Sequence, residues 1–334
     1  CISETSENRE KAKSPVDYVD PYIGNISHLL VPTYPTVHLP NSMLRVDPER
    51  KDYTSDQVAG LPVIVTSHRG SSAFNISPVS DISGRVEAVK MYSYDKEKIT
   101  PYRYQVYLDE EQVEVDFAPS HQAAVYNIRF EKGEAGNLVI NTRNGLIQYD
   151  GKGVSGYQRI GAGPTKIYVY METMQKPERV GVVDSQVVNF GKASAEGRNK
   201  ALVLTFKEKQ VNLRYGISFI STEQAHKNLT REMQTYDVRE VAEKGRKNWN
   251  NTLGKIEIQD GCECDKIVFY TSLYRTYERM ITLSASGRYY SRTDNKVPED
   301  NGVPFYTDDW TCDTYRAPHS LRVLRVDAIE RDID

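Results

Sequence analysis

Several features that mark large protein classes are missing from this 334-residue sequence. Its formal net charge is only −3, so it lacks the basic excess that nucleic-acid binding requires, and we expect no nucleic-acid partner. No apolar run reaches the roughly 18 residues of a transmembrane helix. With 39% hydrophobic and 27% charged residues, the composition is that of a soluble globular protein. The length corresponds to about two domains.

Cysteine is also scarce, with four residues in the whole chain. Cys262 and Cys264 form a C-x-C pair, without a second pair or a histidine at ligand spacing, so a zinc site is not expected. Two states remain open: a disulfide from one of this pair to Cys312 in an exported protein, or free and partly buried thiols. We expect the free thiols.

The sequence begins with Cys1 rather than Met, and residues 2–15 are polar and without apolar periodicity. Such a stretch is typical of a flexible tether. The beginning resembles that of a mature bacterial lipoprotein, in which the cysteine carries the lipid. We therefore expect lipidation of Cys1 and export to the periplasm or cell surface, with membrane contact only through that anchor. The alternative is that the sequence merely happens to begin at a cysteine.

Tyrosine, by contrast, is abundant, at 23 against 8 Phe and 2 Trp, which suits β-sheets and aromatic platforms with a polar edge. Short β-branched and aromatic runs alternate with turn residues from about residue 16 to 258. The pattern predicts an antiparallel β-sandwich. Its expected strands are residues 61–66, 102–108, 113–117, 124–130, 137–141, 166–171, 186–190, 201–206 and 211–220.

The pattern then changes to helical spacing. Residues 237–253 carry apolar side chains three and four apart, with Asp237 as the expected N-cap. We expect a brief strand at 255–258, a second helix at 265–280, and an extended piece at 287–291. A final helix is expected from near residue 309 through 316.

Residues 306–316 combine three carboxylates, an indole, two tyrosines and an arginine, the chemistry of a site that holds a polar ring-shaped ligand. Asp313 and Arg316 are three apart and share a helix face, so Arg316 can orient the carboxylate for sugar hydroxyls. An ordinary i,i+3 salt bridge accounts for the same spacing. Asp309 and Asp313 lie one turn apart, too close to act as a separated acid and base with a water between them.

Motifs in order along most of the chain resemble the glycoside hydrolase family 92 α-mannosidases. They are VDYVDPYIGN (16–25), GISFIS (216–221) with Ala225 and Asn228-Leu229, WN…LGKI (249–256), FYTSLYRT (269–276), GRY (287–289) and W…DTYR (310–316). The sequence departs from the family in two loops near residues 34–43 and 67–72, and Cys312 replaces a tryptophan. It therefore resembles a divergent branch.

The resemblance implies a mainly β chain: a tether at 1–15, an N-terminal antiparallel β-sandwich at 16–236 and linker helices at 237–286. Residues 287–334 would be the start of an (α/α)6 barrel that is otherwise absent. It also implies calcium-dependent hydrolysis of α-mannosides with inversion. The catalytic carboxylates and most Ca²⁺ ligands would lie elsewhere in the barrel, so we assign no catalytic and no metal-binding residue here.

On this resemblance, five residues are expected to contact substrate: Asp313, Arg316, Trp310, His68 and Gly24. Trp310 is either a stacking wall for a sugar ring or a core contact. His68 either hydrogen-bonds a sugar hydroxyl or is simply a loop histidine. Gly24 is expected to permit positive φ or a close backbone approach.

The sequence therefore predicts an exported, calcium-dependent, inverting exo-α-mannosidase that acts on N-glycans or mannans. These 334 residues alone are expected to be inactive. The alternative is a non-catalytic carbohydrate-binding surface lipoprotein, because sandwich folds host many functions.

Overall fold

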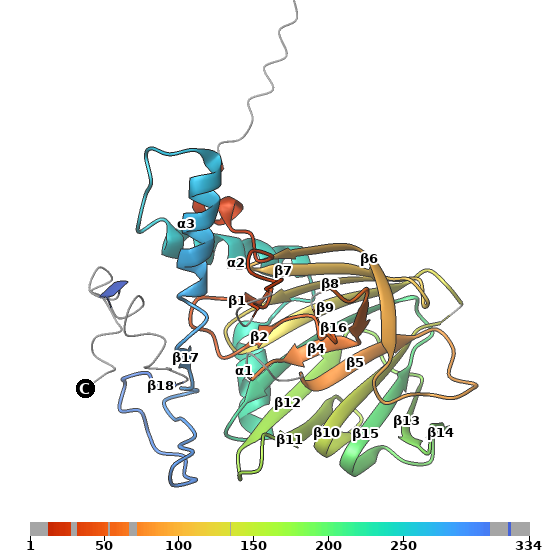
Figure 1. Ribbon diagram of the computed structural model, residues 1–334. Helices are drawn as coiled ribbons and strands as arrows, with labels where there is room; N and C mark the ends of the chain where they lie inside the picture. The colour runs from red at the N-terminus through yellow and green to blue at the C-terminus, as the bar shows by residue number, and fades with distance from the viewer. Residues whose placement is uncertain are drawn as a thin grey trace, which may run out of the picture.

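The computed structural model describes residues 13–27, 32–52, 54–66, 72–133, 135–307 and 320–321. The chain is mainly β, with a 14-stranded antiparallel sheet that curls into two layers (Figure 1). No helix in these ranges is both long and apolar enough to cross a membrane.

Most strands belong to this one sheet, in the spatial order β14-β13-β15-β10-β11-β12-β16-β9-β8-β7-β6-β3, with β5 on β10 and β4 on β5. The strands are β1 (Val37–His38), β2 (Arg45–Val46), β3 (Gln57–Ala59), β4 (Leu61–Ile64), β5 (Ala73–Val79), β6 (Met91–Thr100), β7 (Arg103–Leu108), β8 (Val113–Pro119), β9 (Ala123–Phe130), β10 (Asn137–Tyr149), β11 (Val154–Arg159), β12 (Lys166–Thr173), β13 (Arg179–Asp184), β14 (Val187–Asn189), β15 (Ser194–Thr205), β16 (Gln210–Ser218), β17 (Ile281–Thr282) and β18 (Tyr306–Thr307).

The 13-residue strand β10 joins the two layers. Its first residues pair with β5 and its last with β11, while β15 follows it along most of its length. One layer therefore holds β4, β5, β15 and β13, and the sheet turns from β10 through β11 and β12 into the other layer. The antiparallel sandwich expected from the sequence is confirmed.

Buried tyrosines tie the two layers together. Tyr126 on β9 and Tyr215 on β16 are fully buried, and their hydroxyls donate to the carbonyls of Pro62 (2.7 Å) and Val63 (2.6 Å) on β4. A buried phenol needs such a partner, because an unpaired hydroxyl in the core costs about 1–3 kcal/mol. The two hydroxyls therefore link β9 and β16 to β4 across the core.

Two helices cover part of the outer face of the second layer (Figure 1). Helix α1 (Thr222–Glu232) packs on β16 and β12, and α2 (Val238–Leu253) packs on β8 and β9. Gly216 permits the close approach of α1, since a Cβ there would lie 2.2 Å from the carbonyl oxygen of Ala225. Helix α1 was not predicted, although Ser221 caps it and accepts from the Gln224 amide.

Helix α2 was predicted correctly, with Asp237 as its N-cap, whose side chain accepts from the Arg239 amide. The predicted strand at 255–258 is absent from the assigned strands, because no neighbouring strand runs beside it; Ile256 instead accepts from the Tyr270 hydroxyl at 3.1 Å. The chain then enters α3 (Glu263–Arg275).

Helix α3 ends at Arg275, earlier than the predicted end at 280. The residues that would continue it are engaged by a distant loop: Asn41 donates its backbone amide to the Tyr277 carbonyl and its side-chain amide to the Met280 carbonyl. These tertiary bonds replace the next helical turn. The expected extended piece near 287–291 forms only isolated bridges.

Candidate functional site

The predicted site residue Gly24 lies in a tight turn. The Tyr22 amide donates to Asp20 Oδ1 (2.9 Å), the Asn25 amide to the Tyr22 carbonyl (3.0 Å), and Gly24 has φ +82°. A Cβ at Gly24 would lie 2.9 Å from Thr33 Oγ1, and the Thr33 amide donates to the Gly24 carbonyl at 2.8 Å. The expected positive φ of Gly24 is confirmed; its contact with substrate stays a prediction.

Arg275, in the last turn of α3, fixes this turn in place. Its guanidinium donates to the carbonyl of Pro21 (2.7 Å) and to that of Tyr34. It also pairs with Glu278 at 2.6 Å. The Asp20 amide in turn donates to Thr271 Oγ1 of α3 at 2.9 Å. The FYTSLYRT motif thus serves to hold the loop that carries Gly24.

Glu278 and the residues around it form a buried polar cluster beneath the turn. Its carboxylate accepts from Thr36 Oγ1 and from Arg275, and the hydroxyls of Thr36 and Tyr274 lie 2.9 Å apart. Burial alone would raise the pKa of Glu278. The Arg275 charge and the hydrogen bond from Thr36 outweigh it and hold the pKa below its ordinary value. Glu278 is therefore ionised and structural.

Asp47 is a second buried carboxyl, close enough to Glu278 for the two charges to interact. The Gly24 turn, Arg275, Glu278 and Asp47 are together called the corner. Burial raises the pKa of Asp47 to about 7, against which the nearby Arg45 charge acts. Its Oδ1 has no hydrogen-bond partner among the described residues. Asp47 and Glu278 thus have pKa values displaced in opposite directions. Both are enclosed by the fold, which favours a role in positioning the corner over proton transfer to a substrate.

Trp249 closes the cluster from the side of α2. Its indole is fully buried and donates to the His38 carbonyl at 2.8 Å. The rings of His38 and Tyr274 lie 5.3 and 5.2 Å from it between centroids. Burial lowers the pKa of His38 to about 4, so this imidazole is neutral at physiological pH. The tryptophan of the WN motif therefore joins α2 to α3.

Segments from distant parts of the chain meet the residues that follow α3. Arg45 donates to the carbonyls of Val65 (3.3 Å) and Glu278 (3.1 Å), so it joins the chain just before residue 67 to α3. β17 pairs with β18 through Ile281 and Thr307, which brings the chain just before residue 308 to the same place. Of the predicted contacts, Gly24 is described; the others, His68, Trp310, Asp313 and Arg316, lie outside the described residues, as does Cys1.

Sequence reasoning missed the residues that assemble the corner. Their signals were weak: Arg275 and Glu278 are three apart and so share a helical turn, and Arg45 and Asp47 interrupt an apolar run. Each is an ordinary charge by itself, and only the contacts between distant segments give it a role.

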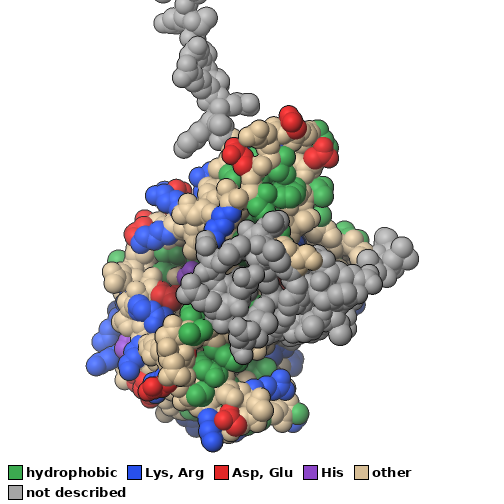
Figure 2. Space-filling view, turned by 90° about the vertical axis from the view of Figure 1, so that its left-hand side faces the viewer, with side chains coloured by type: hydrophobic (Ala, Val, Ile, Leu, Met, Phe, Trp, Pro, Cys, Tyr) green, Lys and Arg blue, Asp and Glu red, His purple; other side chains and the backbone are tan. Residues whose placement is uncertain are grey.

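The face drawn in Figure 2 is partly apolar. Five exposed apolar side chains belong to the turn with Gly24, to α3 and to residues 303–305, and apolar residues exposed singly are ordinary on a protein surface. The five are Ile23 (40% exposed), Ile26 (60%), Val268 (57%), Val303 (48%) and Phe305 (37%).

Cys262 and Cys264 are joined by a disulfide at the beginning of α3, so the expectation of free thiols is wrong. With Asp265 they are the one group of three potential metal ligands in the described ranges. Ca²⁺ prefers six to eight oxygen ligands, and disulfide sulfurs do not supply them. This group does not fit calcium, and no step of a reaction is assigned to a metal here.

The fold and the corner define a class: a β-sandwich with linker helices that presents a glycine turn and a buried ionic cluster at one edge. The sequence matches the profile of the glycosyl hydrolase family 92 N-terminal domain over residues 18–218 and that of the family 92 catalytic domain over residues 224–333. The chain belongs to glycosyl hydrolase family 92, which confirms the resemblance.

Solved structures agree. The family GH92 inverting mannosidase BT2199 from Bacteroides thetaiotaomicron is 26% identical, with a TM-score of 0.81 over 93% of this chain and 46% of its own. The GH92 α-mannosidase BT3965 from the same organism shares the fold, with 20% identity and a TM-score of 0.83 over 93% of this chain and 47% of its own. The GH92 family glycosyl hydrolase ccman5 also shares it, with 19% identity and a TM-score of 0.82 over 95% of this chain and 48% of its own. The chain thus spans about half the length of these relatives. No curated protein matches the sequence.

Proposed function

We propose that this chain forms the N-terminal part of a calcium-dependent, inverting exo-α-mannosidase that removes mannose from N-glycans or mannans. The observation that carries the proposal is the match to both family 92 domains in consecutive order along the chain. The inverting mannosidase at 26% identity supports the stereochemistry, and a relative was solved with mannoimidazole, which supports a mannose-shaped pocket.

In this proposal the chain contributes a wall for the sugar and no catalytic group. The turn that carries Gly24 forms one part of this wall, and Arg275 holds the turn in position. Asp313 accepts hydrogen bonds from sugar hydroxyls, Arg316 orients it, and Trp310 and His68 complete the wall. The family's calcium would polarise and orient the sugar when bound.

We further propose that these 334 residues alone release no mannose. An inverting glycosidase needs an acid and a base far enough apart to admit water. In the corner as described, Glu278 is bound to Arg275 and Thr36, and Asp47 is buried, so neither suits such a pair.

Two measurements on the isolated chain test this. Mannose release from α-linked mannobiose should be undetectable both with Ca²⁺ and with a chelator. Binding of mannose, followed by NMR, should be lost in Asp313→Ala and kept in Asp294→Ala, which removes a carboxylate from the 292–302 loop. Calcium-dependent mannose release by the isolated chain would overturn the division of roles, and unchanged binding by Asp313→Ala would remove Asp313 from the wall.

The second candidate is a non-catalytic carbohydrate-binding surface lipoprotein. It is favoured by the same observation, that Glu278 is bound to Arg275 and Thr36 and that Asp47 is buried, so that neither acts as a catalytic acid or base. It predicts mannan binding that survives calcium chelation. Export and lipidation of Cys1 belong to both proposals, and the disulfide at Cys262–Cys264 supports an oxidising compartment. Metabolic labelling with a fatty acid, lost in Cys1→Ser, tests the anchor.

A further inference from the structure

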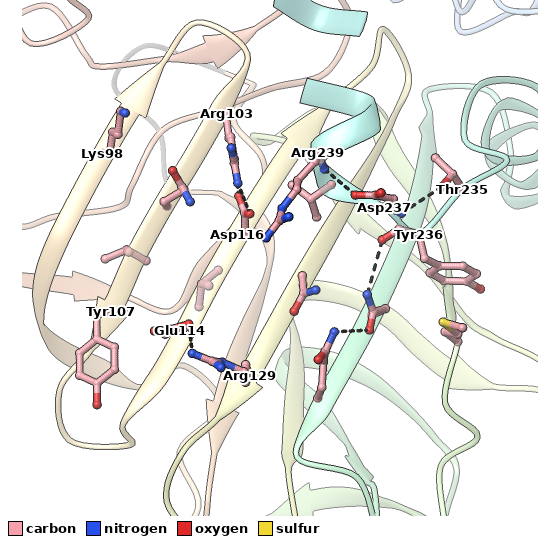
Figure 3. Close-up of a pocket in the computed structure, with 18 of the residues that line it drawn as sticks. Lys98, Arg103, Tyr107, Glu114, Asp116, Arg129, Thr235, Tyr236, Asp237 and Arg239 are labelled. Atoms are coloured by element: carbon pink, nitrogen blue, oxygen red, sulfur yellow. Dashed lines mark hydrogen bonds and ion pairs between the residues drawn. The ribbon is translucent and has the colours of Figure 1, made fainter. Parts of the chain in front are cut away.

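A polar groove lies on the outer face of the sandwich and shares no lining residue with the Gly24 corner. Its volume is about 1060 Å³, with a floor on β6, β7, β8, β9 and β16. Its wall is formed by residues 234–239, which run from the connection after α1 into the first turn of α2 (Figure 3). The same sheet face is apolar where the helices cover it, at Ala118 and Val125, and becomes polar two residues further along, at Asp116 and Asn127. The groove therefore begins where helix packing ends.

The strand register aligns one row of side chains straight across the groove. Lys98 pairs with Gln105, Gln105 with Asp116, Asp116 with Asn127, and Asn127 with Asn212. Neighbouring strands lie about 4.8 Å apart, so the row is about 19 Å long. Three of its five members are carboxamides, in contrast to the mixed charges of an ordinary solvated sheet.

The charges in the floor are largely neutralised. Arg103 forms two hydrogen bonds with Asp116, at 2.8 and 2.5 Å, and Arg129 pairs with Glu114 at 2.5 Å (Figure 3). The side chains of Gln105 and Asn127 are half-buried and make no hydrogen bond to any residue that the structure describes. The groove thus presents free planar amides between satisfied ion pairs.

We propose that this groove is a second carbohydrate site, which binds a neutral oligosaccharide along the amide row. The carboxamides of Gln105 and Asn127 each offer two donors and an acceptor in one plane, which matches the paired hydroxyls of a sugar ring, while Asn212 is held by Gln175, Gln210 and the Tyr236 carbonyl. Tyr107 at one end and Tyr236 at the other add aromatic surface for its apolar faces. Asp116 and Glu114 are already paired with Arg103 and Arg129, so the floor offers a sugar amides rather than free carboxylates. The site would hold a polymer while its end is trimmed at the corner, a use that rests on the proposed function.

The test uses the whole chain and three soluble polysaccharides in affinity electrophoresis: an α-mannan, dextran and polygalacturonate. The wild-type chain should be retarded by a neutral polymer. Gln105→Ala/Asn127→Ala should weaken that affinity by about tenfold or more, the loss expected for two hydrogen-bonding amides. The matched control, Gln57→Ala/Asn251→Ala, removes two exposed amides outside the groove and should bind like wild type.

Each outcome decides. No retardation of the wild-type chain by mannan or dextran, retention by polygalacturonate alone, or full binding by Gln105→Ala/Asn127→Ala would overturn the proposal. Binding of dextran but not of mannan would support the groove as a carbohydrate site and would contradict the proposal that the enzyme acts on mannosides. If the double variant melts early, Tyr107→Ala, a partly exposed position, replaces it and should likewise weaken binding.

Discussion

The ion pair at the end of α3 gives the sharpest test of how the corner is held. In Arg275→Met the chain keeps a side chain of similar length but loses the guanidinium that pairs with Glu278 and donates to the Pro21 and Tyr34 carbonyls. Glu278 then remains as a largely buried charge without its main partner. We expect the variant to fold and to be clearly less stable than wild type.

The magnitude follows from burial. Breaking a fully buried pair costs about 3–5 kcal/mol, because an uncompensated charge is left in the interior. The side chains of Arg275 and Glu278 are 16% and 20% exposed, so solvent reduces the cost. We expect a loss of about 3 kcal/mol in the free energy of unfolding at pH 7. Adding Glu278→Gln to the variant should recover at least about 1 kcal/mol, since the amide carries no charge.

Urea unfolding followed by circular dichroism measures these differences. Lys244→Met, which breaks the exposed i,i+4 pair with Glu240, is the matched control and should cost about 0.5 kcal/mol or less. The gap between wild type and Arg275→Met should narrow as the pH falls through 4.5, the ordinary pKa of a glutamate. Without Arg275, burial raises the pKa of the Glu278 carboxyl in the variant above that value, whereas the pKa in wild type lies below it. The reasoning would be refuted if Arg275→Met lowered the free energy of unfolding by less than about 1 kcal/mol. It would also be refuted if the double variant Arg275→Met/Glu278→Gln lost as much as the sum of the losses of the two single variants.

The remaining predictions concern titration, packing and the disulfide. The pKa of Asp47 in the folded state is raised to about 7, so the contribution of Asp47 to the free energy of unfolding falls as the pH rises from about 4 to 7. The pKa of His38 in the folded state is lowered to about 4, so the contribution of His38 rises as the pH rises from about 4 to 6.5. In wild type the two slopes cancel below about pH 6.5; in Asp47→Asn, unfolding free energy should instead rise with pH there. Gly216→Ala should cost about 3 kcal/mol by displacing α1, while Gly84→Ala, with open space around it, should be neutral in the same melting assay. Reduction of Cys262–Cys264 should expose two alkylatable thiols by mass spectrometry, with a melting shift of at most about 2 °C because the closed loop is short.

Contrary results are equally specific. A flat stability profile in Asp47→Asn would mean that His38 is not the opposing group. Equal melting of the Gly216→Ala and Gly84→Ala variants would contradict the close contact of α1 with β16, and an unreduced chain that alkylates at Cys262 would contradict the disulfide.

Local patterns were enough to predict much of the sheet and one helix. Alternating apolar residues predicted β7, β8 and β9 nearly to the residue, and helical spacing with Asp237 as cap predicted α2. These elements are set by periodicities of two and 3.6 that can be read along the chain. The prediction failed where a distant segment competed with local preference, as when Asn41 ended α3 early.

By itself the sequence determined the strand and helix periodicities, the positive-φ glycine at residue 24 and the membership of family 92, since each depends on neighbouring residues or ordered motifs. Only the tertiary structure decided which charges matter. Glu278 meets Thr36 across 242 positions and Arg275 meets Pro21 across 254, and no spacing along the chain encodes such a meeting. The amide row of the outer groove arises in the same way, because strand register, rather than sequence distance, places Gln105 beside Asp116 and Asn127 beside Asn212.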